Sequence, residues 1–243
     1  MLDRERGVIP LEKLELPKES LRTLKIMMSR PEGIILVTGP TGSGKTTTLY
    51  SLLNYISSEK INIMTLEDPV EYPFPLIRQT SVNEASGMGF ANGIKSLMRQ
   101  DPDVILVGEV RDAETAEMAF RAAMTGHQVF TTLHTNSAIG ALPRLRDIGI
   151  IPEIMAGNII GVIAQRLVRK LCSFCKTAHR PTAEDLQLLS NRAGLVAKKI
   201  FKPKGCTACD QTGYKGRFAL LEILKMNSDL DDLLARGATT KEI

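Results

Sequence analysis

Short apolar runs alternate with longer helical segments along the first half of the chain. Four runs rich in β-branched residues are typical of buried strands, at residues 34–37, 61–66, 104–107 and 128–133. Segments with helical patterns lie between them, at residues 45–57, 90–100 and 113–125. Strands that alternate with helices predict an α/β domain with a mainly parallel sheet.

The flanking segments complete the expected domain organisation. Residues 17–28 have the apolar spacing of an amphipathic helix, and further helical stretches are expected at residues 137–147 and 152–170. Four parts are therefore expected: a linker and amphipathic helix from a missing upstream domain at 1–32, an α/β core at 33–168, a cysteine-containing module at 169–211, and a helical, truncated C-terminal segment at 212–243.

A glycine-rich segment follows the first strand and precedes a helix. Its glycines let successive backbone N–H groups turn into one concavity, and the helix adds its positive N-terminal end. Lys45 can then reach the β- and γ-phosphates of a nucleotide, and the Thr46 hydroxyl is placed to ligate Mg²⁺. The spacing predicts a nucleoside triphosphate site formed by Gly39, Pro40, Thr41, Gly42, Ser43, Gly44, Lys45, Thr46 and Thr47.

Acidic residues follow the second and third strands. Glu67, Asp68 and Glu71 come after the second strand, and Glu109 comes after the third. Open α/β sheets bind ligands at the carboxyl ends of their strands, so we expect these carboxylates beside the phosphates. In phosphate-loop NTPases such an acid holds the water shell of Mg²⁺, which is the role predicted for Glu109. The residues alone leave open which of the three earlier acids activates the attacking water.

Two histidines bracket the fourth strand. His127 precedes it and His134 follows it. A single histidine is most often structural, because neutral imidazole readily satisfies loop carbonyls. His134 has the better claim to a function, because it is expected at the same sheet edge as Glu71 and Glu109.

All four cysteines occur in two Cys-x-x-Cys pairs, Cys172 with Cys175 and Cys206 with Cys209. In a cytoplasmic chain such pairs indicate metal ligands rather than disulfides, and four thiolates suit the tetrahedral coordination of structural Zn²⁺. The 30 residues between the pairs must fold locally, and residues 182–195 have a helical pattern. Redox chemistry is the alternative, but neither pair lies in a thioredoxin-like βαβ pattern.

The composition is that of a soluble globular protein, with 43% hydrophobic and 24% charged residues. No stretch approaches the roughly 18 consecutive apolar residues that a membrane span needs, and the N-terminus lacks the apolar core of a signal peptide. These features predict a cytoplasmic protein that can dock on a membrane complex.

The net charge of +4 is unevenly distributed. Residues 165–217 contain twelve Lys or Arg and three acids, so this segment carries +9 and the rest of the chain carries −5. Such asymmetry is typical of a surface for nucleic acid or anionic lipid. The alternative is a solvated face beside an anionic metal centre.

Four motifs together resemble one known family. They lie at residues 39–46, 67–71, 107–112 and 125–136. In combination they are similar to the secretion ATPases that power type II secretion and type IV pilus assembly, the GspE/PilB-like branch, over residues 10–243. The two Cys-x-x-Cys pairs narrow the resemblance to assembly and secretion motors, because the pilus-retraction and conjugation relatives lack this module.

The resemblance implies a RecA-like phosphate-loop ATPase core that uses ATP, Mg²⁺ and Zn²⁺. Carried over to this sequence, Glu71 would orient and deprotonate the attacking water, Glu109 would lie on the Mg²⁺ side, and His134 would sense the γ-phosphate. The family also implies a homo-hexamer of the full-length protein. Its partners would be inner-membrane platform proteins, which would hold this cytoplasmic protein peripherally on the inner membrane.

Two other functions fit parts of the sequence. A nucleic-acid-binding ATPase could bind nucleic acid through the basic cysteine-containing module. That module, however, has few aromatic side chains that could stack on bases: Phe174, Phe201 and Tyr214. A GTPase is the third hypothesis, and the chain lacks the Asn-Lys-x-Asp pattern that selects guanine. Transport is therefore the favoured function.

The resemblance also predicts that the 243-residue chain is a weak catalyst when taken alone. Family members carry an upstream domain whose arginines reach a neighbour's nucleotide, and removing such an arginine costs about 10³–10⁵ in rate. We expect the chain to bind ATP, to hydrolyse it slowly and to be mostly monomeric or weakly associated by light scattering. A stable hexamer of this chain with rapid hydrolysis would contradict the prediction.

Overall fold

The computed structural model describes residues 8–193 and 199–243, in two compact units. The first unit contains residues up to Arg166 together with residues 219–243, and the second contains residues 167–218. Two strands, β6 (Ile159–Leu171) and β9 (Tyr214–Lys225), continue along the chain from one unit into the other.

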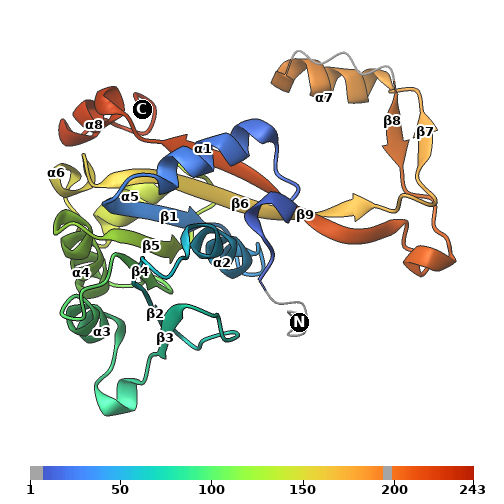
Figure 1. Cartoon of the computed structure of the whole chain (residues 1–243). Helices are drawn as coiled ribbons and strands as arrows, with labels where there is room; N and C mark the ends of the chain where they lie inside the picture. Colours follow the sequence, from blue (N-terminus) through green and yellow to red (C-terminus); the bar gives the residue numbers. More distant parts are fainter. Residues whose placement is uncertain (1–7, 194–198) are drawn as a thin grey trace. The chain divides into compact units, whose positions relative to one another are not determined.

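The first unit is built on one sheet (Figure 1). In the described part of the chain, seven strands join this sheet in the order β3-β2-β4-β5-β1-β6-β9. Besides β6 and β9 they are β1 (Gly33–Thr38), β2 (Ile63–Glu67), β3 (Ile77–Ser81), β4 (Val104–Val107) and β5 (Gln128–Leu133). Neighbouring strands from β3 to β6 all pair in parallel, which confirms the predicted mainly parallel sheet.

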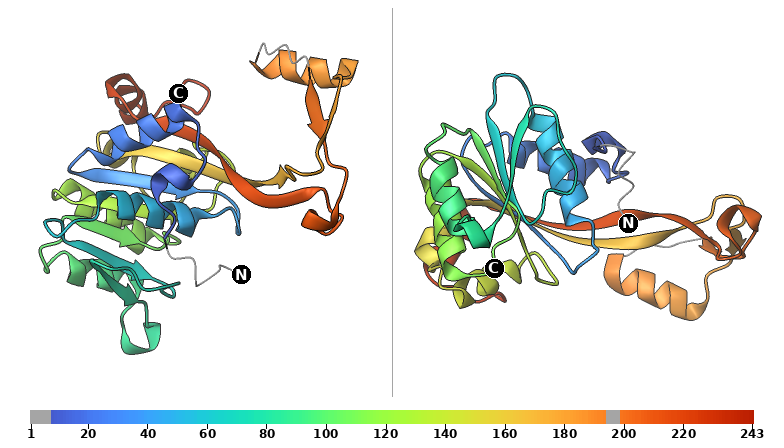
Figure 2. Two further views of the ribbon diagram at one scale, coloured as in Figure 1. Left: turned by 45° about the vertical axis from the view of Figure 1, so that its right-hand side comes forward. Right: turned by 90° about the horizontal axis from the view of Figure 1, so that it is seen from below.

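Helices cover both faces of the sheet, as two further views show (Figure 2). Alternate residues of β1 enter two separate cores: Ile34 and Leu36 pack with α3 and α4, whereas Ile35 and Val37 pack with α1 and α2. The helices of this unit are α1 (Lys18–Met28), α2 (Lys45–Ile56), α3 (Phe90–Leu97), α4 (Ala113–Met124), α5 (Ala141–Asp147), α6 (Pro152–Met155) and α8 (Ser228–Ala235). Within the described ranges, every helix is too short or too polar to cross a bilayer.

The parallel register brings four strand ends to one edge of the sheet. Thr38 at the end of β1 pairs with Leu133 at the end of β5. Val107 at the end of β4 pairs with Thr131 of β5 and with Leu66 of β2. The chain leaves all four strands in the same direction, so the segments that follow them are neighbours at the edge where such sheets bind ligands.

The helix predicted at residues 152–170 is wrong. Only α6 is helical, and most of the remainder forms strand β6. Ile159, Val162 and Ile163 are at most 2% exposed, because β6 lies between β1 and β9 and is covered on both faces. A strand buried on both faces lacks the alternation of polar and apolar residues, and its apolar run is then hard to distinguish from a buried helix.

The C-terminal segment is only partly helical. Strand β9 lies beside β6 in the sheet, and the helix α8 follows it. The expected segment at residues 212–243 therefore coincides with neither unit, because β9 begins in the second unit and ends in the first.

The second unit contains the last residues of β6, the first residues of β9 and several short elements. The strands β7 (Thr177–His179) and β8 (Ile200–Lys202) form an antiparallel pair, and the other elements are α7 (Ala183–Ala193) and a short 3₁₀ turn (Thr207–Cys209). The helix predicted at residues 182–195 is confirmed as far as Ala193, and residues 194 and 195 lie outside the described residues.

Strand β6 contains a glycine at a point of close approach, and this predicts a sensitive position. A Cβ at Gly161 would lie 2.6 Å from Met27 Cε and 2.7 Å from the Leu224 carbonyl oxygen. Gly161→Ala should lower the free energy of unfolding in urea by about 1–3 kcal/mol, because the backbone of β9 must shift.

The matched control is Gly89→Ala, where an added Cβ would meet nothing within 4 Å. This substitution should change the free energy of unfolding by less than about 1 kcal/mol. Equal effects of the two substitutions would contradict the close packing of β6 against β9.

Candidate active site

The loop between β1 and α2 depends on its glycines. Gly39, Gly42 and Gly44 have φ angles of +148°, +76° and +87°, a region that other residues rarely adopt. A Cβ at Gly39 would also lie 2.4 Å from the carbonyl oxygen of Gln165. Helix α2 begins at Lys45, so the loop ends at a helix N-terminus, a favourable place for an anion.

The Lys45 side chain folds back over this loop. Its Nζ donates hydrogen bonds to the carbonyl oxygens of Gly39 at 3.0 Å and Pro40 at 3.3 Å. Burial lowers the pKa of Lys45, and the nearby Glu109 carboxylate offsets only part of that effect. An ammonium that has lost part of its hydration gains strongly from an anionic ligand.

Lys45 and Thr46 share a cleft of about 170 Å³ with side chains from three other strand ends. Glu71 follows β2, Glu109 follows β4 and His134 follows β5. The structure therefore brings together the five side chains that the sequence singles out. The other predicted nucleotide-binding residues do not line this cleft. Thr47 lies in the first turn of α2, and the rest form the loop itself: Gly39, Pro40, Thr41, Gly42, Ser43 and Gly44.

Glu109 is the carboxylate that connects the charged groups of the cleft. Its side chain is 16% exposed and forms an ion pair with Arg111, whose pKa is raised mainly by this hydrogen bond. On its other side, His134 Nε2 lies 3.6 Å from Glu109 Oε2. Glu109 therefore lies between Arg111 and His134.

Glu67 is also at the cleft, but its oxygens are already occupied by donors. It is 4% exposed, Tyr50 donates its hydroxyl to Oε2, and Thr65 Oγ1 and Gln79 Nε2 donate to Oε1 at 2.5 and 3.2 Å. Burial and the Glu67 carboxylate raise the pKa of Tyr50, so its phenol stays a neutral donor. Glu67 is thus held in place by donors to both oxygens, whereas Glu71 is exposed in the cleft.

The same network shapes the segment that carries Glu71. Gln79 on β3 accepts a hydrogen bond from the Phe74 backbone N–H at 2.8 Å and donates one to the Tyr72 carbonyl oxygen at 3.3 Å. The roles of Tyr50 and Gln79 are not predicted by the sequence. A tyrosine on the buried face of a helix and a glutamine on an edge strand belong to no recognised motif, and their roles emerge only from the contacts.

The two histidines are separated by the length of β5. His134 lines the cleft, whereas His127 lies before β5, at the end opposite to the strand tips that line the cleft. The His127 Nδ1 lies 2.9 Å from the Ala122 carbonyl oxygen and 3.2 Å from Thr125 Oγ1, at the end of α4. The His127 ring therefore contacts the C-terminal end of α4, which is a structural position.

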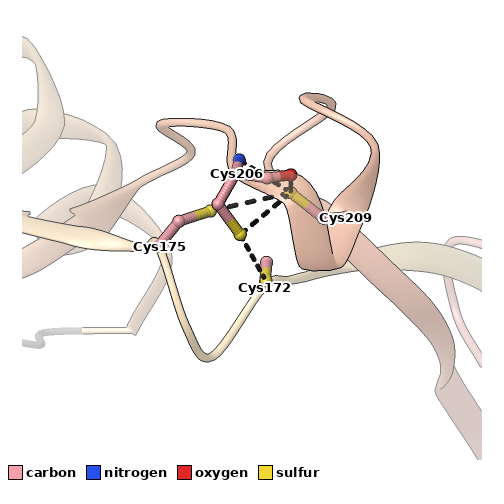
Figure 3. A group of neighbouring side chains, drawn as sticks. All are labelled: Cys172, Cys175, Cys206 and Cys209. Carbon is pink, nitrogen blue, oxygen red and sulfur yellow. Dashed lines mark hydrogen bonds between the residues drawn. The ribbon is translucent and has the colours of Figure 1, made fainter.

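The four cysteines gather at one point in the second unit (Figure 3). Their sulfur atoms all lie within 4.8 Å of one another. The Sγ atoms of Cys206 and Cys209 are 3.7 Å apart, those of Cys175 and Cys209 are 3.8 Å apart, and those of Cys172 and Cys206 are 3.9 Å apart. Tetrahedral Zn²⁺ with Zn–S bonds of about 2.3 Å requires sulfurs about 3.8 Å apart, so the spacing suits such an ion.

Backbone donors support this cluster. The N–H groups of Cys206 and Gly213 lie 3.3 and 3.2 Å from the Sγ of Cys209. Burial raises the pKa of Cys209, but these donors together with the thiols of Cys206 and Cys175 lower it to about 7. Burial and the hydrogen bond to Cys209 raise the pKa of Cys206 to about 11. Thiolates are the form in which cysteines bind metals, so the backbone here favours ligand formation.

Comparison with known proteins agrees with the geometry. The whole chain, residues 1–243, matches a family model described as type II/IV secretion system protein. It is 46% identical to the type II secretion system protein E of Dickeya dadantii, over 98% of this chain and 47% of that protein. It is 44% identical to the type IV pilus assembly ATPase TfpB of Acinetobacter baylyi, over 100% of this chain and 42% of that protein.

The chain thus spans about half the length of the curated relatives it matches. A similar fold occurs in the crystal structure of the pilus retraction motor PilT with bound ADP, with a TM-score of 0.71 and 33% identity over 96% of this chain and 57% of that one. The family model covers every residue, and the relatives share more than two fifths of the aligned positions. The chain belongs to the type II/IV secretion system protein family.

Proposed function

We propose that this chain binds Mg²⁺-ATP in the cleft and hydrolyses it. The observation that carries the proposal is the convergence of Lys45 and Thr46 with Glu71, Glu109 and His134 from three other strand ends. In-line phosphoryl transfer needs a cation beside the phosphates and a metal ion that bridges the β- and γ-phosphate oxygens. It also needs a carboxylate that orients the attacking water. The cleft supplies one side chain for each of these tasks.

Each residue has a distinct role in this proposal. Lys45 neutralises the β- and γ-phosphates, and the gain is large because its ammonium is partly desolvated. Thr46 ligates Mg²⁺, and Glu109 holds the water shell of the metal. His134 lies beside Glu109 and senses the γ-phosphate.

Glu71 is the base that orients and deprotonates the attacking water. Glu67 ends β2, and Asp68 and Glu71 follow it. Of these three acids, Glu67 is excluded because donors occupy both of its oxygens. Asp68 and Glu71 are both exposed in the cleft, and the motif that this chain shares with secretion ATPases assigns the base to Glu71. A carboxylate without a fixed hydrogen-bond partner can accept the proton of water.

We further propose that the chain is the motor part of a subunit in a homo-hexamer that drives protein secretion or type IV pilus assembly. The relatives are named as a type II secretion system protein and a type IV pilus assembly ATPase, which supports transport as the work performed. The proposed partners are inner-membrane platform proteins, which would hold this cytoplasmic protein peripherally on the inner membrane. These relatives do not favour the nucleic-acid-binding alternative.

We also propose that the four cysteines bind Zn²⁺. The sulfur spacing and the donors to Cys209 support a closed structural site, in which all four ligands come from the protein. The ion would join the two Cys-x-x-Cys pairs and so stabilise the fold of residues 167–218.

Lys45→Ala and Glu71→Gln separate binding from chemistry. Lys45→Ala should weaken binding of a fluorescent ATP analogue by about 10–100-fold, because a charge-assisted contact to phosphate is lost. Glu71→Gln should bind the analogue normally but slow single-turnover hydrolysis of radiolabelled ATP by about 10²–10⁴-fold, the usual contribution of a general base. Asp68→Asn is the control from the same loop. A greater loss of turnover in Asp68→Asn than in Glu71→Gln would transfer the role of base to Asp68.

Metal analysis tests the cysteine site. Purified chain should contain one zinc ion by plasma mass spectrometry, and Cys172→Ser should lower both the zinc content and the resistance of residues 167–218 to proteolysis. Lys45→Ala should keep the full zinc content, because Lys45 belongs to the other unit. A wild-type chain that contains no zinc, and takes up none when its thiols are reduced, would contradict the proposal.

A further inference from the structure

We propose that Gln165 is a positioning residue that holds the phosphate loop in its nucleotide-binding conformation. This inference rests on the proposed ATP site and adds to it a residue that touches no part of the cleft. Gln165 lies near the middle of β6 and is only 2% exposed, directly after the apolar residues 159–164. A buried amide of this kind must find partners for both of its ends.

The side-chain amide of Gln165 hydrogen-bonds to the phosphate loop at one end and to helix α2 at the other. Nε2 donates to the Ser43 carbonyl oxygen at 2.7 Å, and Oε1 accepts from Thr48 Oγ1 at 2.7 Å. The backbone of the same residue packs against the start of the loop, where a Cβ on Gly39 would lie 2.4 Å from the Gln165 carbonyl oxygen. One residue therefore contacts the beginning of the loop, its end and the first turn of α2.

The bond to Ser43 determines where the next N–H group points. In a trans peptide the carbonyl oxygen and the N–H of the following residue point in opposite directions. Because Gln165 holds the Ser43 oxygen behind the loop, the Gly44 N–H is turned to the other side, toward the concavity that receives a phosphate. Gly44 has φ of +87°, and glycine has wide conformational freedom, so this peptide needs an external partner to stay in one orientation.

The bond to Thr48 fixes the loop relative to the helix. Thr48 is 2% exposed and lies in the first turn of α2, three residues after Lys45. Holding Ser43 and Thr48 from one amide keeps the loop and the helix N-terminus as a single unit. Preorganised donors bind an anion more tightly because no ordering cost remains to be met on binding.

Gln128 provides a matched control within the same sheet. It is 4% exposed, and its Nε2 donates to the carbonyl oxygens of Met28 at 3.1 Å and Arg30 at 2.6 Å. It is the first residue of β5, at the end of that strand opposite to His134. Gln128→Leu therefore removes a comparable buried amide far from the phosphate loop.

The first experiment compares Gln165→Leu with Gln128→Leu in the 243-residue chain. Both substitutions should lower the midpoint of urea unfolding, because both leave buried polar groups without partners. Only Gln165→Leu should raise the Kd of a fluorescent ATP analogue, by about 10-fold, because the loop must then be ordered when the nucleotide binds. Equal Kd values for Gln165→Leu and wild type, or equal increases in Kd for both variants, would overturn the inference.

The second experiment uses Gln165→Glu and pH. The ionised carboxylate can still accept from Thr48 but offers no donor to the Ser43 oxygen, whereas the protonated acid regains an O–H donor. Relative to wild type at each pH, the Kd of Gln165→Glu should therefore be raised at high pH and should recover as the pH falls. Lys45, Glu109 and His134 are common to both proteins, so the ratio of the two Kd values compares proteins that differ only at position 165. If the ratio of the Kd of Gln165→Glu to that of wild type did not change with pH, a role for the hydrogen-bond donor to the Ser43 oxygen would be contradicted.

A third measurement needs no nucleotide and separates this inference from the proposed function. Hydrogen–deuterium exchange of the backbone amides at residues 41–48 should be faster in Gln165→Leu than in wild type and unchanged in Gln128→Leu. If wild type bound no ATP, the proposed function would fail, and the exchange experiment would still decide whether Gln165 holds the loop. Unchanged exchange at residues 41–48 in Gln165→Leu would overturn the inference.

Discussion

The parallel register of β2, β4, β5 and β1 is the constraint on which the site depends. Pairing of Thr38 with Leu133 and of Val107 with Thr131 places the phosphate loop, the Glu109 segment and the His134 segment beside one another. A slip by one residue would move a strand end by about 3.3 Å and exchange the two buried faces of the strand. Because these strands are buried on both faces, their packing fixes the geometry of side chains that are distant in the sequence.

The charges of the cleft explain why its ligand should be a metal-bound triphosphate. Four carboxylates line it, those of Glu67, Asp68, Glu71 and Glu109, and Lys45 is the lysine among the described lining residues. A free triphosphate would meet repulsion from these acids. A divalent cation held by these acids would offset that repulsion, while the donors to Glu67 occupy one of the four carboxylates.

The local motifs were sufficient to predict the phosphate loop, four of the strands and the cysteine cluster, because each rests on residues close together in the chain. Strand β6 was mistaken for a helix because its residues 159–164 are apolar on both faces, and β3 was missed because its edge position leaves it only partly buried. The sequence gives only a weak signal for Gln165, which lies between the apolar residues 159–164 and the charged Arg166. Its partners Ser43 and Thr48, however, lie more than a hundred residues away and are known only from the fold.

A crystal structure of this chain with Mg²⁺ and a non-hydrolysable ATP analogue tests the central claim most directly. The account predicts that the triphosphate lies in the phosphate loop, that Lys45 Nζ leaves the Gly39 and Pro40 carbonyl oxygens for the β- and γ-phosphates, and that Mg²⁺ binds Thr46 on the side of Glu109. The Glu71 carboxylate should face the γ-phosphate across a single water molecule. A nucleotide bound elsewhere, or Glu71 and Glu109 directed away from the phosphates, would contradict the account.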